Sequence, residues 1–183
     1  MNEDTDEALM MAHLAGDPAA FQTLFTRLAP AIHGFFLRAF GNRAVADDLL
    51  QTTFLKMHRA RRQWHQDKRL KPWLFSIAAR VRLDELRRRY ALREDLDPEG
   101  VERAAEEQAT DLPDPGVAAD VKARVHAAIE RLPESQRTVV HLHRFEGLTF
   151  AEIAEILGTT EGAVKLRAFR AYAELRKLLE DLL

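Results

Sequence analysis

The chain has 183 residues, of which 46% are apolar and 31% are charged, and it contains no cysteine. These values exclude a wholly disordered chain, a disulfide framework, a thiolate zinc site and a thiol nucleophile. The formal net charge of −2, taken alone, argues against a protein that binds nucleic acid.

The first predicted elements are two helices, because apolar residues recur at three- and four-residue spacing and no stretch alternates as a strand would. A short helix covers about residues 6–15. Asp17 and Pro18 then supply an N-cap and a first-turn proline for a long second helix. Pro30 lies inside this helix and should bend it.

The next two predicted helices complete a first domain over residues 1–93. One begins near Ala44 and is followed by a polar break over residues 63–71. Pro72 is expected to start the other, which should end in the basic run Arg87–Arg89.

Residues 94–120 differ in charge from the sequence on either side. Their net charge is −9, against +6 for residues 1–93 and +1 for residues 121–183. They also contain several prolines and glycines and few large apolar residues, which is typical of a flexible linker. The overall charge therefore conceals a basic first domain.

The second domain, residues 121–183, is also expected to be helical, with Pro133 dividing its first two helices. Thr149 and Glu152 have the spacing of a capping box, Gly158 ends that short helix, and a final helix follows from Glu161. This order is the outline of a helix-turn-helix. The predicted fold is therefore all-α, with two helical domains joined by an acidic flexible linker.

The final helix separates its residues by face. Its inner face, which should pack on the preceding helix, consists of Val164, Ala168, Ala171 and Leu175. The half that would enter a major groove carries, on other faces, Lys165, Arg167, Phe169 and Arg170. The basic residues suit phosphates or guanine, and Phe169 suits either a thymine methyl group or an inhibitory partner. The alternative is a solvated helix with ordinary surface charge.

A second candidate surface lies between Arg59 and Arg89, where basic residues surround aromatic ones. Unpaired bases stack on aromatic rings while Lys and Arg follow the backbone, so this segment suits single-stranded DNA. Trp64, in the polar break, contacts either a base or the core, whereas Trp73 is expected to belong to the core. The arginines of the fourth helix could instead form a solvated face.

Short motifs recur in a recognisable order: residues 46–54 are ADDLLQTTF, 72–78 are PWLFSIA, 132–137 are LPESQR and 161–165 are EGAVK. Together they resemble the extracytoplasmic-function group of RNA polymerase sigma factors, in the sigma-70 superfamily. The first resembles the polymerase-clamp-binding motif of that group. The second resembles the segment that melts the minus-10 promoter element, and the last two resemble the minus-35-binding module.

The resemblance implies a factor that directs core RNA polymerase to promoters and helps to melt the minus-10 element. Its implied partners are the clamp and flap of core polymerase, promoter DNA and an anti-sigma factor, with no cofactor and no small-molecule substrate. It assigns polymerase binding to Asp47, Asp48, Leu50, Gln51 and Phe54, with Leu50 and Phe54 as apolar contacts or as core. It assigns minus-10 DNA binding to Arg62, Trp64, Lys68, Lys71, Trp73, Arg80, Arg87 and Arg88. It assigns minus-35 DNA binding to Thr160, Glu161, Lys165, Arg167, Phe169 and Arg170.

A few residues depart from the family pattern. Ala79 and Arg80 stand where an Arg-Asn pair is usual, Leu166 stands where Ser is usual, and Phe169 stands where His is frequent. These departures affect contacts near the melted strand and the sequence recognised upstream.

Two other functions stay open: a helix-turn-helix regulator that acts without polymerase, and a sigma-like decoy that titrates an anti-sigma factor. An enzyme is the least expected, because His141 and His143 point to different faces of a helix and no further ligand recurs at metal spacing. The first residues are acidic, and no apolar stretch approaches the roughly 18 residues of a membrane span. We therefore expect a cytoplasmic protein without direct membrane insertion.

Overall fold

The computed structural model describes residues 5–96 and 117–180, and these residues form helices and no strand. This confirms the all-α prediction. The chain divides into two compact units, Met1–Ala109 and Thr110–Leu183. Most of the predicted linker, residues 97–116, lies outside the described residues. The helices on either side of it reach Leu96 and begin at Val117, so both extend into the stretch assigned to the linker.

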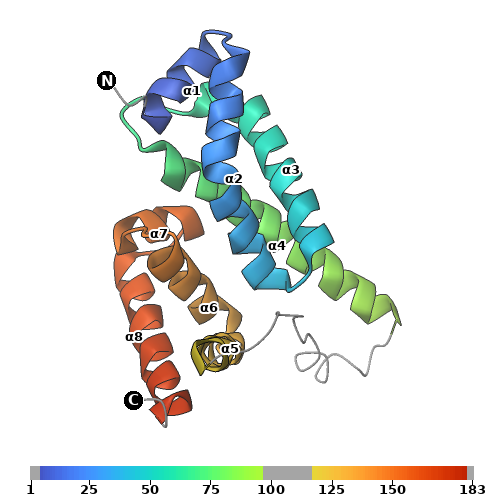
Figure 1. Ribbon diagram of the computed structural model, residues 1–183, viewed down its shortest axis with the longest axis vertical. Coiled ribbons are helices and arrows are strands. Elements are labelled where there is room, and N and C mark those ends of the chain that lie inside the picture. The colour runs from blue at the N-terminus through green and yellow to red at the C-terminus, as the bar shows by residue number, and fades with distance from the viewer. Residues whose placement is uncertain (1–4, 97–116, 181–183) are drawn as a thin grey trace. The chain divides into compact units, whose positions relative to one another are not determined.

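The first unit is a group of antiparallel and crossing helices in which α2 packs against α1 and α3, and α3 packs against α4 (Figure 1). Its elements are α1 (Asp6–Leu14), α2 (Pro18–Phe40), α3 (Arg43–Ala60), the 3₁₀ turn η1 (Arg61–Gln63) and α4 (Leu70–Leu96).

The ends of α2 follow from local chemistry. Asp17 Oδ1 accepts a hydrogen bond from Ala19 N at 2.8 Å, and Pro18 occupies the first turn, where no N–H is needed. Gly41 ends the helix with a φ of 62°, which glycine adopts without steric cost. Between these ends the helix runs through Pro30.

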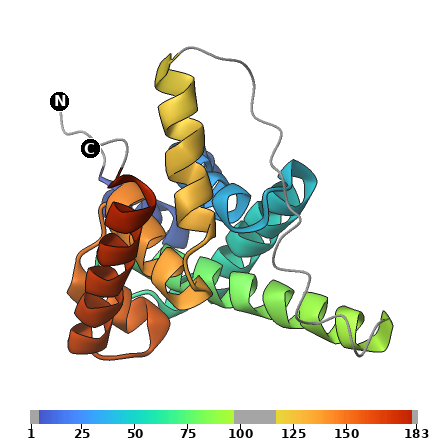
Figure 2. The ribbon, with the colours of Figure 1, turned by 90° about the horizontal axis from the view of Figure 1, so that it is seen from below.

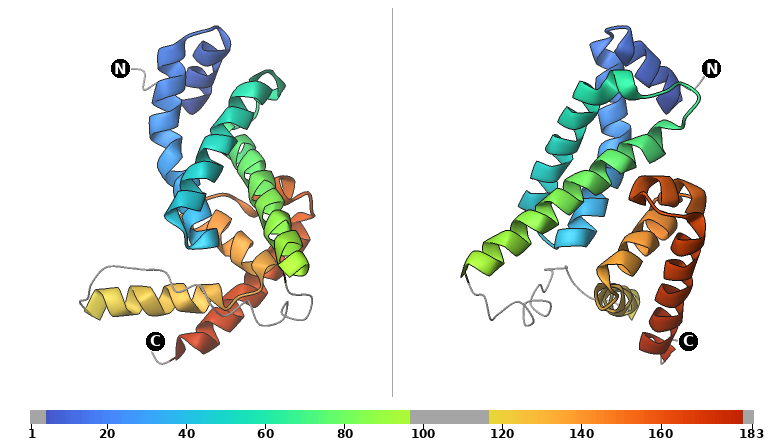
Figure 3. Two further views of the ribbon diagram at one scale, coloured as in Figure 1. Left: turned by 90° about the vertical axis from the view of Figure 1, so that its right-hand side faces the viewer. Right: turned by 180° about the vertical axis from the view of Figure 1, so that it is seen from behind.

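Helix α4 begins earlier and ends later than its sequence predicts (Figure 3). It starts at Leu70, which is fully buried, so Pro72 lies within the first turn instead of starting the helix. Leu70 N donates a hydrogen bond to Glu7 Oε1 of α1 at 2.9 Å, which satisfies one free N–H at the start of α4. The helix also continues past Arg89 to Leu96, because a basic run favours the last turn without terminating a helix.

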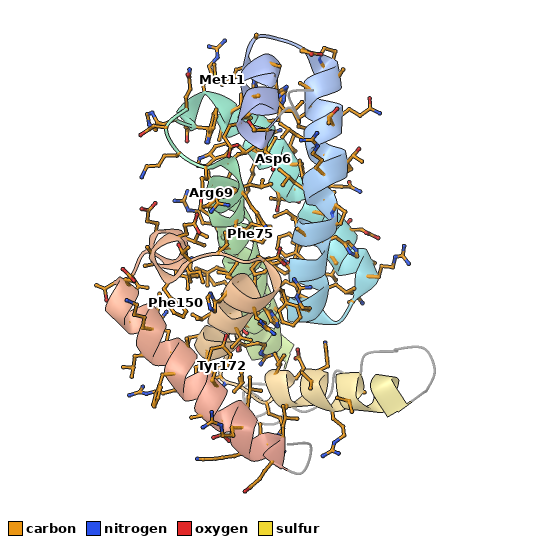
Figure 4. The ribbon with its side chains drawn as sticks, turned by 60° about the vertical axis from the view of Figure 1, so that its left-hand side comes forward. Asp6, Met11, Arg69, Phe75, Phe150 and Tyr172 are labelled. Carbon is orange, nitrogen blue, oxygen red and sulfur yellow. The ribbon has the colours of Figure 1, made fainter. Side chains whose placement is uncertain are left out.

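The core of the first unit is rich in phenylalanine. Phe35 and Phe36 of α2 have no exposed surface, and neither has Phe75 of α4, which is labelled in Figure 4. The rings of Phe35 and Phe75 meet edge to face with centroids 5.7 Å apart, a favoured aromatic arrangement. This contact joins the centre of α4 to α2.

The second unit is built around α8, which packs against α6 and α7. Its elements are α5 (Val117–Glu130), α6 (Glu134–Val140), the π-helical turn η2 (His141–Phe145), α7 (Phe150–Leu157) and α8 (Glu161–Leu178). Within this unit α5 projects away from the other helices (Figure 2). The buried cluster Leu132, Val140 and Ala171, with Leu175 against it, joins the end of α5 and α6 to α8.

The wider turn η2 was not predicted, because apolar spacing alone does not distinguish a π-helical turn from an α-helix. Leu148 N donates to Leu142 O at 3.1 Å, and Gly147 adopts a φ of 67° to turn the chain back. The result leaves Phe145 48% exposed while Glu146 is buried.

Candidate functional site

The outer face of α3 carries the acidic residues predicted to bind polymerase. Asn42 opens this helix, because its Oδ1 accepts a hydrogen bond from a first-turn N–H at 3.1 Å. Asp48 and Gln51 are exposed and lie three residues apart, so they share one side of the helix. Asp47 lies toward α2, with its Oδ1 3.1 Å from Nε2 of His33. Asp48 and Gln51 are therefore the more accessible part of the predicted motif.

The apolar part of the motif was expected to serve as a contact surface or as core. Phe54 is only 3% exposed, and its ring lies 4.7 Å from that of Phe25, so it belongs to the core. Leu50 is half-buried. The exposed apolar residue beside Asp48 is Leu55, at 49% exposure. Helical spacing could have found Leu55, which lies opposite the buried positions of α3.

Trp64, which was expected to contact either a base or the core, belongs to the core in this structure. The residue is 4% exposed, so neither face of its ring is open for stacking. The physical reason is that the large apolar surface of an indole favours burial over exposure in a solvated loop. A single tryptophan inside a polar stretch can thus anchor a loop to a core.

The segment around Trp64 contains cationic residues that were predicted to bind minus-10 DNA. Arg62 and Lys68 are exposed. Lys71 is half-buried, and its Nζ lies 5.8 Å from the centroid of the Phe75 ring. Trp73 is half-buried as well, although it was expected to belong to the core. Trp73 is therefore the tryptophan that retains surface for a base.

The exposed arginines of α4 differ in their hydrogen bonds. Arg80, Arg87 and Arg88 are all exposed. Arg88 donates two hydrogen bonds, both of 2.8 Å, to the buried carboxylate of Glu85, and Arg89 Nε donates a third of 2.8 Å. The hydrogen bond from Arg88, with help from Arg89, holds the pKa of Glu85 below its usual value despite burial. Part of the charge of the arginine run is thus neutralised within α4.

Two exposed apolar residues of α4 were missed by the sequence reasoning. Leu83 is 46% exposed and Tyr90 is 56% exposed. With Arg80 and Arg87 they follow helical spacing of three and four residues, so all four share one side of α4. This spacing is the sequence signal that could have identified Leu83 and Tyr90 as exposed.

The helix-turn-helix is fixed by side-chain caps. Thr149 Oγ1 accepts a hydrogen bond from Glu152 N at 3.2 Å, and Glu152 Oε2 accepts one from Thr149 N at 2.8 Å, which confirms the predicted capping box. Gly158 ends α7 with a φ of 62°. Thr160 Oγ1 accepts a hydrogen bond from a first-turn N–H of α8 at 3.2 Å, so this predicted DNA contact already serves as an N-cap.

The side chains of α8 point as the sequence predicts on the inner face, where Val164, Ala168 and Ala171 are buried. Other side chains of α8 project away from the rest of its unit, as Figure 4 shows. Tyr172, which belongs to α8, is labelled there.

The charged residues predicted on α8 are not equally available. Lys165 Nζ forms an ion pair with Glu161 at 2.8 Å, one helical turn away, and both are exposed. Arg170 is exposed and Arg167 is half-buried. Phe169, by contrast, is 71% exposed, more than any other large apolar residue that the structure describes.

Two searches of the described residues concern metal ions and membrane spans. Within residues 5–96 and 117–180, no group of three or more His, Cys, Asp or Glu side chains could hold a metal ion. Over the same residues, no helix is both long and apolar enough to cross a membrane.

Comparison with known protein families identifies both units. Residues 24–91 match the family described as Sigma-70 region 2, and residues 122–175 match that described as Sigma-70, region 4. These two matches cover α3 and most of α4 in the first unit and the helix-turn-helix in the second.

Similar proteins extend over nearly the whole chain. The RNA polymerase sigma factor CarQ of Myxococcus xanthus is 38% identical over 172 residues, which is 91% of this chain and 93% of CarQ. The ECF RNA polymerase sigma factor SigM of Mycobacterium tuberculosis is 33% identical, over 97% of this chain and 86% of SigM. Among solved structures, CnrH in complex with the cytosolic domain of CnrY aligns with a TM-score of 0.71 at 26% identity, over 96% of this chain and 97% of CnrH.

Proposed function

The chain belongs to the sigma-70 family, in its extracytoplasmic-function group of RNA polymerase sigma factors, and from this membership we propose which of its surfaces meet polymerase and DNA. As a sigma factor it acts with core RNA polymerase on promoter DNA to start transcription. Its family consists of transcription factors, and its own contribution is binding and DNA opening without a catalytic residue. It acts in the cytoplasm, where polymerase and promoters lie.

The proposed polymerase dock is the exposed side of α3 formed by Asp48, Gln51 and Leu55. The carboxylate and the amide suit basic and polar groups on a partner, while Leu55 supplies apolar area at the centre of the contact. Asp47 borders this face, and its Oδ1 lies 3.1 Å from Nε2 of His33 in α2. The buried Phe54 packs against Phe25 of α2 and so holds α3 to α2.

The proposed minus-10 surface begins at Arg62 and Lys68 and continues over Trp73 to Arg80 and Arg87 of α4. A base that leaves the duplex costs a few kcal/mol of unstacking, which stacking on an aromatic face and contacts to the phosphates offset. Trp73 retains exposed ring surface for this purpose, and the exposed arginines can follow the backbone. In the second unit, α8 would bind the duplex upstream.

The observation that carries the proposal is the presence, in one chain, of a capped helix-turn-helix and a separate unit with an acidic dock and a basic aromatic surface. A helix-turn-helix regulator has no need of the first unit, and a decoy has no need of the DNA-binding surfaces. The same surfaces would be covered by an anti-sigma factor when the protein is held inactive, which is the form of regulation that we propose.

In vitro transcription with core polymerase on a genomic library tests the function. We expect initiation at a discrete set of promoters only when both protein and core are present. Binding to DNA without core would support a conventional regulator, and binding to core without initiation would support a decoy.

The dock is tested by Leu55→Ser and by Asp48→Ala combined with Gln51→Ala. Each should weaken binding to core polymerase without changing the far-UV circular dichroism, since all three residues are exposed. Leu83→Ser is the matched control, because Leu83 is 46% exposed on α4 against 49% for Leu55. Equal core affinity in all variants would reject the dock.

A further inference from the structure

The outermost strip of α8 is apolar where a recognition helix usually carries polar side chains. With 100° between successive residues, the direction opposite the buried Val164 and Ala168 runs through Leu166, and Phe169 lies about 60° to one side of it. These residues are 49% and 71% exposed. Exposed apolar area of this kind is costly in water and indicates a surface used in binding.

Gly162 lies one turn before Leu166 on the same strip. Its backbone does not require glycine, because its φ is not in the left-handed region, and a Cβ built there would meet nothing within 4 Å. Glycine in a helix is roughly 0.5–1 kcal/mol less favourable than alanine. Since packing inside the unit does not explain this cost, we attribute it to the close approach of a partner at the start of α8.

Cationic residues flank the strip on both sides. Lys165, with its exposed ion pair to Glu161, lies on one side, and Arg170 with the half-buried Arg167 lies on the other. A DNA duplex is complementary to this pattern, because its groove has a floor of base edges between two rows of negatively charged phosphates. The only apolar group on that floor is the thymine 5-methyl group, and phenylalanine is among the side chains that contact it.

We propose that Leu166 and Phe169 recognise thymine methyl groups in the major groove of the upstream promoter element, while Gly162 allows the groove edge to approach the helix. This inference rests on the proposed function and specifies the DNA that α8 selects. Promoters used by this protein should therefore carry thymines at the positions opposite the two side chains, on either strand.

Replacement of thymine by uracil tests the proposal, because it removes one methyl group and leaves base pairing intact. With holoenzyme on a promoter obtained from the genomic library, each thymine of the upstream element is replaced in turn. At a recognised position we expect affinity to fall about 4-fold, the factor that corresponds to about 0.8 kcal/mol for one buried methyl group. Thymines in the spacer should tolerate the change.

The protein variants complete a double-mutant cycle. Phe169→Ala should weaken binding to the thymine promoter and abolish the uracil effect at one position, and Leu166→Ala should do the same at another. Gly162→Ala should raise the melting temperature of the second unit but weaken DNA binding. Arg170→Ala should lower affinity for all DNA variants equally.

The outcomes separate this inference from the function on which it rests. Absence of promoter-dependent initiation would reject the function itself. Normal initiation with no uracil effect, or with a uracil effect unchanged in both alanine variants, would overturn methyl recognition alone. Loss of an anti-sigma interaction in Phe169→Ala, with unchanged DNA affinity, would overturn it in favour of a protein partner.

Discussion

Substitution of Trp64 distinguishes a core anchor from a base-stacking residue. The side chain is 4% exposed, so nearly all of its roughly 200 Å² is removed from water on folding. At about 25 cal/mol per Å² this burial is worth at most about 5 kcal/mol, and Trp→Ala changes in cores cost about 3–5 kcal/mol. We therefore expect Trp64→Ala to lower the free energy of unfolding of the first unit by about 3–5 kcal/mol.

The conservative change gives the functional half of the test. Trp64→Phe keeps most of the buried area and removes an indole N–H that donates to no described residue. It should cost about 1 kcal/mol in stability and leave the affinity of holoenzyme for a fork-shaped promoter with a single-stranded minus-10 strand unchanged. Trp73→Ala, at the half-buried position, should reduce that affinity instead.

Both effects can be measured on the full chain. The chain has 2 tryptophans, Trp64 and Trp73, and both lie in the first unit, so fluorescence during urea unfolding reports that unit alone. The residual tryptophan serves as the probe in each variant. A cost below about 1 kcal/mol for Trp64→Ala would refute the assignment to the core. A loss of affinity for the fork-shaped promoter in Trp64→Phe would instead support a contact between Trp64 and a base.

Three further expectations concern charge and capping. Burial lowers the pKa of His13 below its ordinary value of 6.5, and a neighbouring histidine and arginine lower it further. Its contribution to stability is therefore complete above the unfolded pKa and is lost as the pH falls through the folded one, which urea unfolding by fluorescence from pH 7 to pH 5 will show. Thr149→Ala should lower the unfolding free energy of the second unit by about 1 kcal/mol, measured by circular dichroism. Arg87→Ala should weaken promoter binding and reduce its salt slope by about 1, whereas Arg88→Ala should change both less, because a buried carboxylate holds its guanidinium.

Each expectation has its own control. His13→Gln should flatten the pH dependence, and a slope that persists would remove His13 as its source. Thr149→Ser keeps the capping oxygen, so equal losses in the serine and alanine variants would contradict the cap. Equal salt slopes for Arg87→Ala and Arg88→Ala would show that the ion pair does not withhold Arg88 from DNA.

Helix faces and caps were predictable from the sequence because they depend on neighbours three or four residues away. The capping box at Thr149, the turn at Gly158 and the buried strip of Val164 and Ala168 all have this local origin. The same reasoning could have predicted that Leu55 is solvent-exposed, because it lies on the face of α3 opposite the buried residues.

Features that depend on distant parts of the chain were not predictable. Trp64 is buried although its neighbours in sequence are polar, and the start of α4 at Leu70 is capped by Glu7 of α1. The π-helical turn after Val140 depends on how Leu148 closes on Leu142. None of these contacts leaves a periodic signal within its own segment.

The hydrogen bond from Leu70 N to Glu7 Oε1 sets an order of events during synthesis. It joins residues 63 positions apart, so α1 can complete this contact only after the start of α4 has left the ribosome. Closing a loop of that length costs entropy before any contact is gained. Helix α1 can pack on α2, which follows it directly, before α4 exists, but the start of α4 is capped only once both helices have been made.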